Sequence, residues 1–265
     1  MKSKPIVSWG LALLKKKDPA DILRSLPDLL FPENLYCACC GDTIDRKTRV
    51  HNLCDKCIKM INWISDNPYA SSMDDLAFDD LFSCCIYGYY PRQMISKLKF
   101  QGAGYLARPM AKLMAERILL SYGNNLNELK RDFDCISYVP SSKEKKSKRG
   151  YNQAQLLAKY LSKELDIELA DLLLKPKETP PARLAGKRER KEILEGAFSL
   201  DPRAEIKGRR LKGNLPLKGV RVILVDDVLT TGSTASEAAL TLKDAGCSYV
   251  AVSVFACGNG MISRE

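Results

Sequence analysis

The sequence predicts an α/β fold built on a parallel sheet, preceded by a small module that carries four cysteines for a metal ion. The first prediction rests on residues 220–256, which run strand, helix, strand, and the second on two cysteine pairs between residues 37 and 57. With 265 residues, 45% of them hydrophobic, the chain can bury one α/β core and still hold a small appendage. We place the domain boundary between residues 66 and 67, so that residues 1–66 form an N-terminal helix and metal module and residues 67–265 the α/β domain.

The first seventeen residues have only a superficial likeness to a secretion signal. Two lysines precede an apolar run over residues 6–14, and three more follow it. The run is too short to span a bilayer, no small-residue cleavage site follows, and the main basic cluster lies on the wrong side. We therefore expect a cytoplasmic protein without membrane insertion, whose ten cysteines are thiols and metal ligands rather than disulfides.

An amphipathic helix is predicted over residues 20–30, before the first cysteine. Apolar side chains recur there at three- and four-residue intervals, a pattern that fits a role in packing. After the cysteines, residues 66–80 combine a proline with serines and several aspartates, which is typical of a linker.

The two cysteine pairs predict a structural zinc site. Cys37 and Cys40 are separated by two residues, as are Cys54 and Cys57, and this spacing lets each turn present both sulfurs to one tetrahedral ion. Four thiolates leave no open coordination position, so the ion would stabilise a segment too small for a core of its own. The alternative is free thiols that have this spacing by chance. Residues 54–64, which start at the second pair, are predicted to form a short helix.

His51 is the only histidine of the chain. A Ser-His-Asp or Cys-His hydrolase would need it, but it lies within the cysteine segment, far from any other motif. We treat His51 and the extra thiol of Cys39 as bystanders because four cysteines already complete a zinc shell. The remaining cysteines fall in or beside predicted strands and are interpreted as core residues: Cys84, Cys85, Cys135, Cys247 and Cys257.

Strand and helix patterns alternate between the linker and residue 220. Strand formers are concentrated in residues 84–90, and a second short strand over residues 134–139 ends at Pro140. Apolar residues at helical spacing predict helices over residues 106–122 and 152–165.

Residues 220–225 form an almost continuous apolar run closed by aspartates, which is typical of a strand buried on both faces of a parallel sheet. Residues 233–245 follow as a helix with a stripe of small residues, Gly246 ends it, and residues 249–256 form the next strand. This order predicts a right-handed parallel unit, with any ligand at the carboxyl end of the first strand.

The chemistry is concentrated where that strand meets the helix. Backbone N–H groups at a helix start, with hydroxyls beside them, form a nest for a phosphate dianion, and a glycine lets the backbone come close. The phosphate would repel two adjacent carboxylates, so we expect these to accept hydrogen bonds from a ribose diol, directly or through Mg²⁺. An acidic helix cap would explain the hydroxyls but not the pair of acids. The residues of this sugar-phosphate site are Asp226, Asp227, Thr230, Thr231, Gly232, Ser233 and Thr234.

The formal charge of +10 comes from 42 basic and 32 acidic residues, and the excess is concentrated in three segments. These are residues 143–149, 175–191 and 203–212. They are solvated loops, a surface for a polyphosphate substrate, or a surface for nucleic acid.

Five features of the chain together resemble the ComF family of competence-associated phosphoribosyltransferase-like proteins. They are the cysteine pairs, Leu98-Lys99, the segment Arg-Gly-Tyr-Asn-Gln at residues 149–153, Gly-Ala-Phe at residues 196–198, and the loop at residues 226–234. The loop by itself is similar to the phosphoribosyl pyrophosphate (PRPP) loop of type I phosphoribosyltransferases. The likeness covers roughly residues 30–257.

The resemblance implies a type I phosphoribosyltransferase-like parallel-sheet domain in which the loop binds PRPP. It also implies that residues 139–149 follow the first core strand and hold pyrophosphate, with Lys99 and Arg149 contacting the diphosphate, and that residues 175–191 form a flap over the site. The sequence departs from the family pattern in this flap. Ala182-Arg183 stand where a glutamine is usual and Ile193 where an asparagine is usual, which puts closure over a substrate, and hence catalysis, in question.

The resemblance implies a PRPP-binding protein linked to DNA uptake in natural transformation, with the DNA-uptake machinery as partner. If it is an enzyme, an acceptor displaces pyrophosphate at the anomeric carbon with Mg²⁺ bound, and Asp226 and Asp227 are the catalytic acids. One alternative is a non-catalytic factor that binds nucleotide or single-stranded DNA. Another is a purine or pyrimidine salvage transferase, which would need a base-specific hood that the sequence does not reveal.

Overall fold

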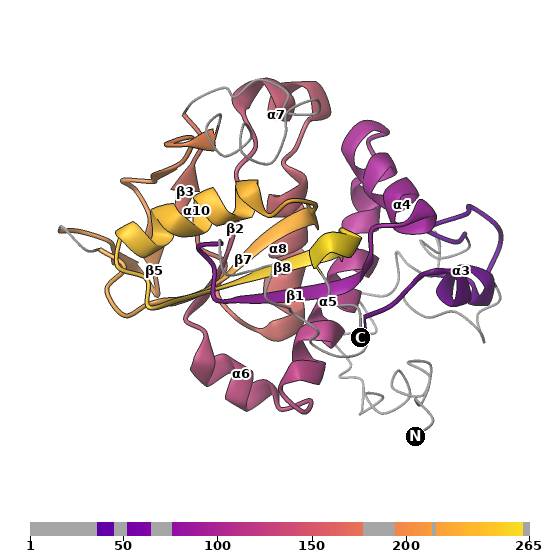
Figure 1. The fold of residues 1–265 in the computed structure, drawn as a ribbon, viewed down its shortest axis with the longest axis horizontal. Coiled ribbons are helices and arrows are strands. Elements are labelled where there is room, and N and C mark those ends of the chain that lie inside the picture. The colour runs from indigo at the N-terminus through magenta and orange to yellow at the C-terminus, as the bar shows by residue number, and fades with distance from the viewer. Residues whose placement is uncertain (1–35, 45–51, 65–75, 177–193, 214–215, 262–265) are drawn as a thin grey trace, which may run out of the picture. The chain divides into compact units, whose positions relative to one another are not determined.

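Figure 1 shows the computed structural model, which describes residues 36–44, 52–64, 76–176, 194–213 and 216–261. The chain divides into two units, Met1–Ile61 and Asn62–Glu265. The boundary predicted between residues 66 and 67 lies outside the described residues and stays a prediction. So does the helix over residues 20–30.

In the N-terminal unit, an antiparallel bridge between Tyr36 and Thr43 closes the turn that carries the first cysteine pair. The second pair opens helix α3 (Asp55–Met60), which starts directly after Cys54. The prediction of a helix as far as residue 64 is wrong, because the backbone becomes extended at Ile61. Isoleucine is β-branched and favours this extended backbone.

The second unit is built on four parallel strands, which lie in the order β1, β8, β7, β2 (Figure 1). Leu224 in β7 has Val252 of β8 on one side and Ser137 of β2 on the other. This arrangement confirms the predicted parallel α/β domain. The strands are β1 (Asp80–Ile86), β2 (Cys135–Tyr138), β7 (Arg221–Leu229) and β8 (Tyr249–Cys257).

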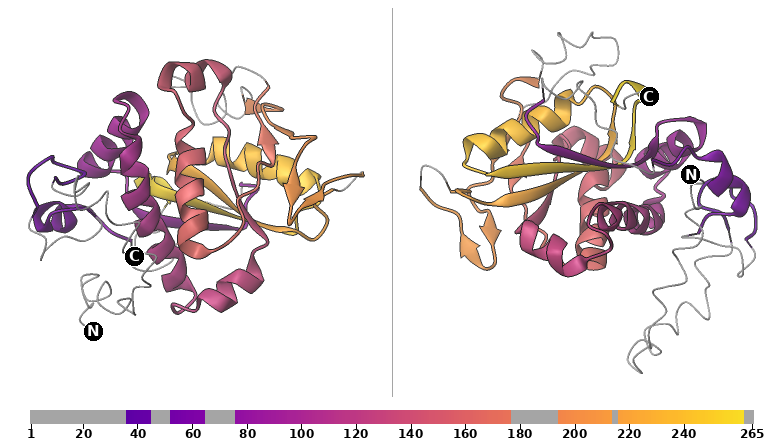
Figure 2. Two further views of the ribbon diagram at one scale, coloured as in Figure 1. Left: turned by 180° about the vertical axis from the view of Figure 1, so that it is seen from behind. Right: turned by 60° about the horizontal axis from the view of Figure 1, so that its bottom comes forward.

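Helices cover both faces of the sheet, as the right view of Figure 2 shows. Helix α10 (Ser233–Asp244) packs on one face, against β7 and β8. Helices α5 (Ala107–Ser121) and α8 (Gln153–Leu165) pack on the other face and against each other. All three were predicted within a few residues of these bounds. The remaining α-helices of the described segments in this unit are α4 (Tyr89–Phe100), α6 (Leu126–Asp132) and α7 (Lys143–Arg149).

The core between α10 and the sheet confirms the predicted small-residue stripe. Ala235, Ala238, Ala239 and Leu242 are buried there against strand residues of β7 and β8. The five cysteines predicted to be core residues are all buried as well. In the part of the chain that the structure describes, no helix is long and apolar enough to cross a membrane.

Two predicted strand ends are wrong. The first strand ends at Ile86, and α4 begins at Tyr89, because Gly88 interrupts the strand and Pro91 fits the first turn of a helix. Strand β7 does not end at residue 225 but continues through both aspartates to Leu229. Its backbone keeps its parallel pairing with β8, with Asp226 opposite Val254.

The basic segment after β2 is helix α7 rather than a loop. The Ser142 side chain caps its first turn by accepting a hydrogen bond from the N–H of Lys145, and Gly150 ends it in the left-handed conformation. Short elements complete the unit: strands β3 (Leu173–Leu174), β4 (Ser199–Leu200), β5 (Glu205–Ile206) and β6 (Arg209–Arg210), and 3₁₀ turns η3 (Gly104–Leu106) and η4 (Asn259–Met261).

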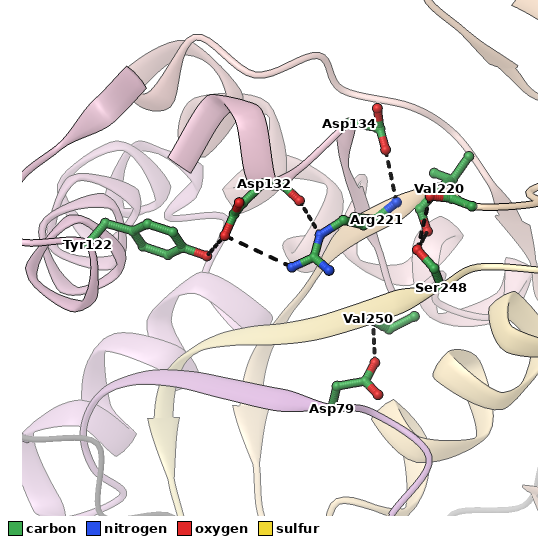
Figure 3. A network of polar contacts seen from close by, with 9 residues as sticks. Asp79, Tyr122, Asp132, Asp134, Val220, Arg221, Ser248 and Val250 are labelled. Carbon is green, nitrogen blue, oxygen red and sulfur yellow. Dashed lines mark hydrogen bonds and ion pairs between the residues drawn. The ribbon is translucent and has the colours of Figure 1, made fainter. Parts of the chain in front are cut away.

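A polar network fixes the amino end of β7 (Figure 3). The Arg221 Nε donates to the carbonyl of Asp132 at 2.5 Å, and the Arg221 backbone N–H donates to the carboxylate of Asp134 at 3.0 Å. The guanidinium also lies 4.2 Å from the ring centroid of Tyr249, and Tyr122 donates to the Asp132 carboxylate. This network ties α6 and β2 to the end of β7 opposite the predicted site, so we assign it to stability.

Candidate functional site

A hollow lies where β7 passes into α10, and it is lined by Asp226 and by residues 228–235. The helix begins at Ser233, so the backbone N–H groups of its first turn and the positive end of its dipole lie at this hollow. The hydroxyls of Thr231 and Ser233 lie 3.0 Å apart and hydrogen bond to each other. The arrangement can hold an anion. The predicted residues that line the hollow are Asp226, Thr230, Thr231, Gly232, Ser233 and Thr234.

Gly232 has a backbone conformation that side chains disfavour, with φ of 76°. A Cβ atom at this position would also lie 2.9 Å from the Cδ1 of Leu76. The segment before β1 packs on the loop at this point, since the N–H of Ala77 donates to Ser236 Oγ at 2.9 Å. The sequence predicted the need for glycine here but not the contact with Leu76.

The two acids lie on opposite faces of the sheet. Both belong to β7, where successive side chains alternate between faces. Val222 and Leu224 pack in the core on the α10 side, and Asp226 continues that face and lines the hollow. Asp227, 4% exposed, does not line the hollow, and its carboxylate pairs with Lys99 at 2.9 Å.

The surroundings of Asp226 favour its protonated form. Burial raises the pKa of this carboxyl to about 7, and the adjacent Asp227 adds to the rise, while the positive charges of Lys99 and Lys175 oppose it. A hydrogen bond that one Asp226 oxygen accepts from the N–H of Asp227, at 2.8 Å, opposes the rise in pKa as well. A cation or a set of hydroxyl donors at the hollow would favour ionisation.

Lys99 and Arg149 come from different helices, and neither lines the hollow. Lys99 lies in the last turn of α4, where its side chain is about a quarter exposed, at 23%. Arg149 ends α7, donates to Gln153 Oε1 at 2.9 Å, and lies 5.0 Å from the ring centroid of Phe100. The guanidinium of Arg149 therefore lies over the ring of Phe100, the residue that follows Lys99.

The segment at residues 149–153 joins α4, β2 and α8. The Tyr151 hydroxyl donates to the carbonyl of Leu98 at 2.7 Å. The Asn152 side chain donates to the carbonyl of Val139 and also caps α8 by accepting from the N–H of Ala154, both at 3.1 Å. These contacts give the motif a structural role that sequence reasoning missed.

Lys175 is a further basic residue near the site. Burial lowers its pKa, Lys145 lowers it further, and Asp226 opposes the shift. Its ammonium lies 5.1 Å from the ring centroid of Phe198. The sequence placed Lys175 in the basic flap, and no local signal separates it from the neighbouring lysines. Residues 177–193, which hold the remainder of that flap and both departures from the family pattern, lie outside the described residues.

The four predicted zinc ligands come together in the N-terminal unit. The sulfurs of Cys37, Cys40, Cys54 and Cys57 all lie within 4.8 Å of one another. The sulfurs of Cys40 and Cys54 are 3.8 Å apart, which is about the separation that tetrahedral geometry gives for a zinc–sulfur bond of about 2.3 Å. The residues present therefore fit a closed structural zinc site.

The thiols of this cluster differ in acidity. Burial opposes ionisation of Cys37, yet hydrogen bonds from the backbone N–H groups of Cys54, Cys40 and Cys39 lower its pKa to about 7. Burial raises the pKa of Cys40 to about 11 and raises that of Cys57 further. Four sulfurs at this distance therefore need a cation before all can ionise. Cys39 is buried beside the cluster and is not one of its members, and His51 lies outside the described residues.

The chain is similar to several curated proteins, although no family model matches it. It is 33% identical to competence protein F of Haemophilus influenzae over 171 residues, which cover 63% of this chain and 69% of that protein. It is 29% identical over 160 residues to the DNA utilization protein YhgH of Escherichia coli K12, spanning 60% of this chain and 63% of YhgH. It is 24% identical to competence protein ComFC of Bacillus subtilis over 240 residues, 91% of this chain and 85% of ComFC.

Among solved structures, a purine phosphoribosyltransferase from Pyrococcus horikoshii matches with 21% identity and a TM-score of 0.28, over 54% of this chain and 73% of that chain. This likeness is too weak to support an argument. The sequence relatives are informative, because their identity to this chain extends over 160 residues or more. With 33% identity over 69% of competence protein F, the chain belongs to the ComF family.

Proposed function

We propose that this protein binds PRPP through the loop between β7 and α10 and acts in DNA uptake as a phosphoribosyltransferase-like protein. The observation that carries the proposal is the hollow lined by one carboxylate and by the hydroxyls and backbone of a helix start. A phosphate at the helix start and hydroxyl donors beside Asp226 match the 5-phosphate and ribose of PRPP.

In this proposal the residues of the loop divide the ligand between them. The first turn of α10 and the hydroxyls of Thr231, Ser233 and Thr234 hold the 5-phosphate. Asp226 faces the ribose hydroxyls, and Lys99 and Arg149 are the diphosphate contacts. The oxygen donors present suit Mg²⁺, which would arrive with PRPP and neutralise its diphosphate.

If the protein turns over, an acceptor forms a bond to the anomeric carbon as the bond to the diphosphate breaks, and pyrophosphate leaves with the bonding electrons. The charges that change are those on the diphosphate and on the sugar. Lys99 and Arg149 would stabilise the first, and Asp226 the second. No histidine base is needed for this step, in keeping with a chain whose one histidine belongs to the cysteine segment.

The place in DNA uptake is inferred from the relatives. Two of them are named competence proteins and one a DNA utilization protein. We propose that this protein acts in the cytoplasm, alongside the DNA-uptake machinery.

A second candidate function, binding of single-stranded DNA without catalysis, is favoured by the surface at α7. Phe100 is 59% exposed and stacks with Arg149, and α7 carries four lysines besides this arginine, with no buried side chain. An exposed ring next to a row of cations is the combination that holds bases and phosphates of a single strand. A steep fall in affinity with salt would identify such binding.

Titration calorimetry with PRPP and Mg²⁺ tests the proposal. We expect binding by the wild-type chain and its loss in the Asp226→Ala, Asp227→Ala double variant, while Asp244→Ala, at the exposed end of α10, binds normally. An unchanged affinity in the double variant would refute the site. Native mass spectrometry of the protein with PRPP and a metabolite extract would reveal a ribosylated acceptor, and pyrophosphate release with a free nucleobase would indicate salvage.

A further inference from the structure

The two adjacent carboxylates near the end of β7 have different surroundings, although both residues are aspartates. Asp226 borders the hollow on the α10 face. Asp227 is buried on the opposite face, and the acid is held by the ammonium of Lys99 at 2.9 Å. The alternation of side chains along β7 causes this separation, since the strand continues to Leu229. A sugar in the hollow would border Asp226, whereas Asp227 is not among the residues that line it.

Lys99 is held at two points. Asp227 fixes its ammonium, and the Tyr151 hydroxyl fixes the backbone one residue before it, through the carbonyl of Leu98. Leu98 itself is fully buried. The side chain of Lys99 is partly exposed, so the ion pair lies at the edge of the core with one side open to solvent.

A lysine ammonium has three N–H donors, and Asp227 uses the direction of one. The others can donate to an anion at the open side. A buried carboxylate that neutralises part of the lysine charge also keeps the ammonium in place when no ligand is bound, because an unpaired carboxylate there would be unfavourable. Asp227 therefore holds the Lys99 ammonium in a fixed position from which it can bind an anion.

From this geometry we propose that the two acids have different roles: Asp226 contacts the ribose, whereas Asp227 is a positioning residue that acts through Lys99, with Tyr151 as a second positioning residue. The inference rests on the proposed PRPP site and refines it. It keeps Lys99 as a diphosphate contact and removes Asp227 from direct contact with the sugar.

Two ligands separate these roles. Ribose 5-phosphate carries the phosphate and the diol, and PRPP adds the diphosphate. We expect Asp226→Asn to weaken both ligands about tenfold or more, since each loses a charge-assisted hydrogen bond. Asp227→Asn and Lys99→Met should weaken PRPP about tenfold but ribose 5-phosphate less than threefold. Tyr151→Phe should lower PRPP affinity in the same direction by a smaller factor.

The double variant Asp227→Asn, Lys99→Met should bind PRPP no worse than Lys99→Met, because both changes remove one contact. Lys163→Met, on the exposed side of α8, controls for the loss of one positive charge. The inference is overturned if Asp227→Asn weakens ribose 5-phosphate as much as Asp226→Asn does, or if the two changes add.

Failure of the proposed function has a different signature. A wild-type chain that binds neither ligand would refute the PRPP site and with it the ligand-directed part of the inference. The positioning contact between Asp227 and Lys99 is then tested by urea unfolding of the wild type, Asp227→Asn, Lys99→Met and the double variant. Coupling between the two changes supports the contact, and additive changes in the unfolding midpoint refute it.

Discussion

Asp226 offers a test that needs no ligand, because its surroundings disfavour the charged form. The pKa of this carboxyl is raised from an ordinary value of 3.8 to about 7 by burial and by Asp227. Between these values the folded chain binds a proton that the unfolded chain has released, so stability falls as the pH rises through this window. Replacement by asparagine, which is neutral at every pH, should remove this loss.

The full shift corresponds to about 4 kcal/mol at neutral pH. Water reaches the open side of Asp226, so we expect roughly half, about 2 kcal/mol. For a chain of this size the gain corresponds to a rise of about 4–8 °C in Tm. Asp226→Asn should therefore melt higher than wild type at pH 8, and the difference should be much smaller at pH 4.

Thermal unfolding followed by circular dichroism at pH 4, 5, 6, 7 and 8 measures this difference. Asp244→Asn, at an exposed acid of α10, is the matched control for the removal of one carboxylate. A difference between Asp226→Asn and wild type that does not change with pH would refute the reasoning. A gain in stability with loss of PRPP binding would mark Asp226 as a residue retained for function.

Three further predictions concern the loop, the metal and the fold. Gly232→Ala should lower PRPP affinity about tenfold, because a side chain at positive φ costs about 1–2 kcal/mol. Gly208→Ala, strained in the same way but in the β5–β6 turn, should leave calorimetric affinity unchanged, and equal losses would contradict a local role. The purified chain should hold one zinc ion by elemental analysis. Cys57→Ser should lose it and Cys247→Ala keep it, whereas a zinc-free wild type would contradict the site. Arg221→Ala should lower the free energy of unfolding by about 2 kcal/mol through its lost hydrogen bond and ring contact, and a change below about 0.5 kcal/mol in urea would contradict this.

Local patterns in the sequence were sufficient for the parts of the fold that neighbouring residues specify. The apolar run before Asp226, the helix from Ser233 and the two cysteine pairs could be predicted because strand, helix and turn periodicities lie within short windows. The loop could be predicted for the same reason, since its glycine and hydroxyls act on the adjacent backbone. Strand ends were less accurate, because β7 is extended beyond residue 225 by its pairing with β8.

Tertiary structure alone decided how distant residues meet. Nothing local indicates that Lys99 pairs with Asp227, that Tyr151 holds the end of α4, or that the charge of Lys175 acts on Asp226. These contacts depend on helices and strands brought together by a sheet whose order differs from the order of the chain. The sequence by itself therefore predicted the loop between strand and helix, and the sheet decided which of the two acids borders the hollow, because alternation along a strand has meaning only once each face has its own neighbours.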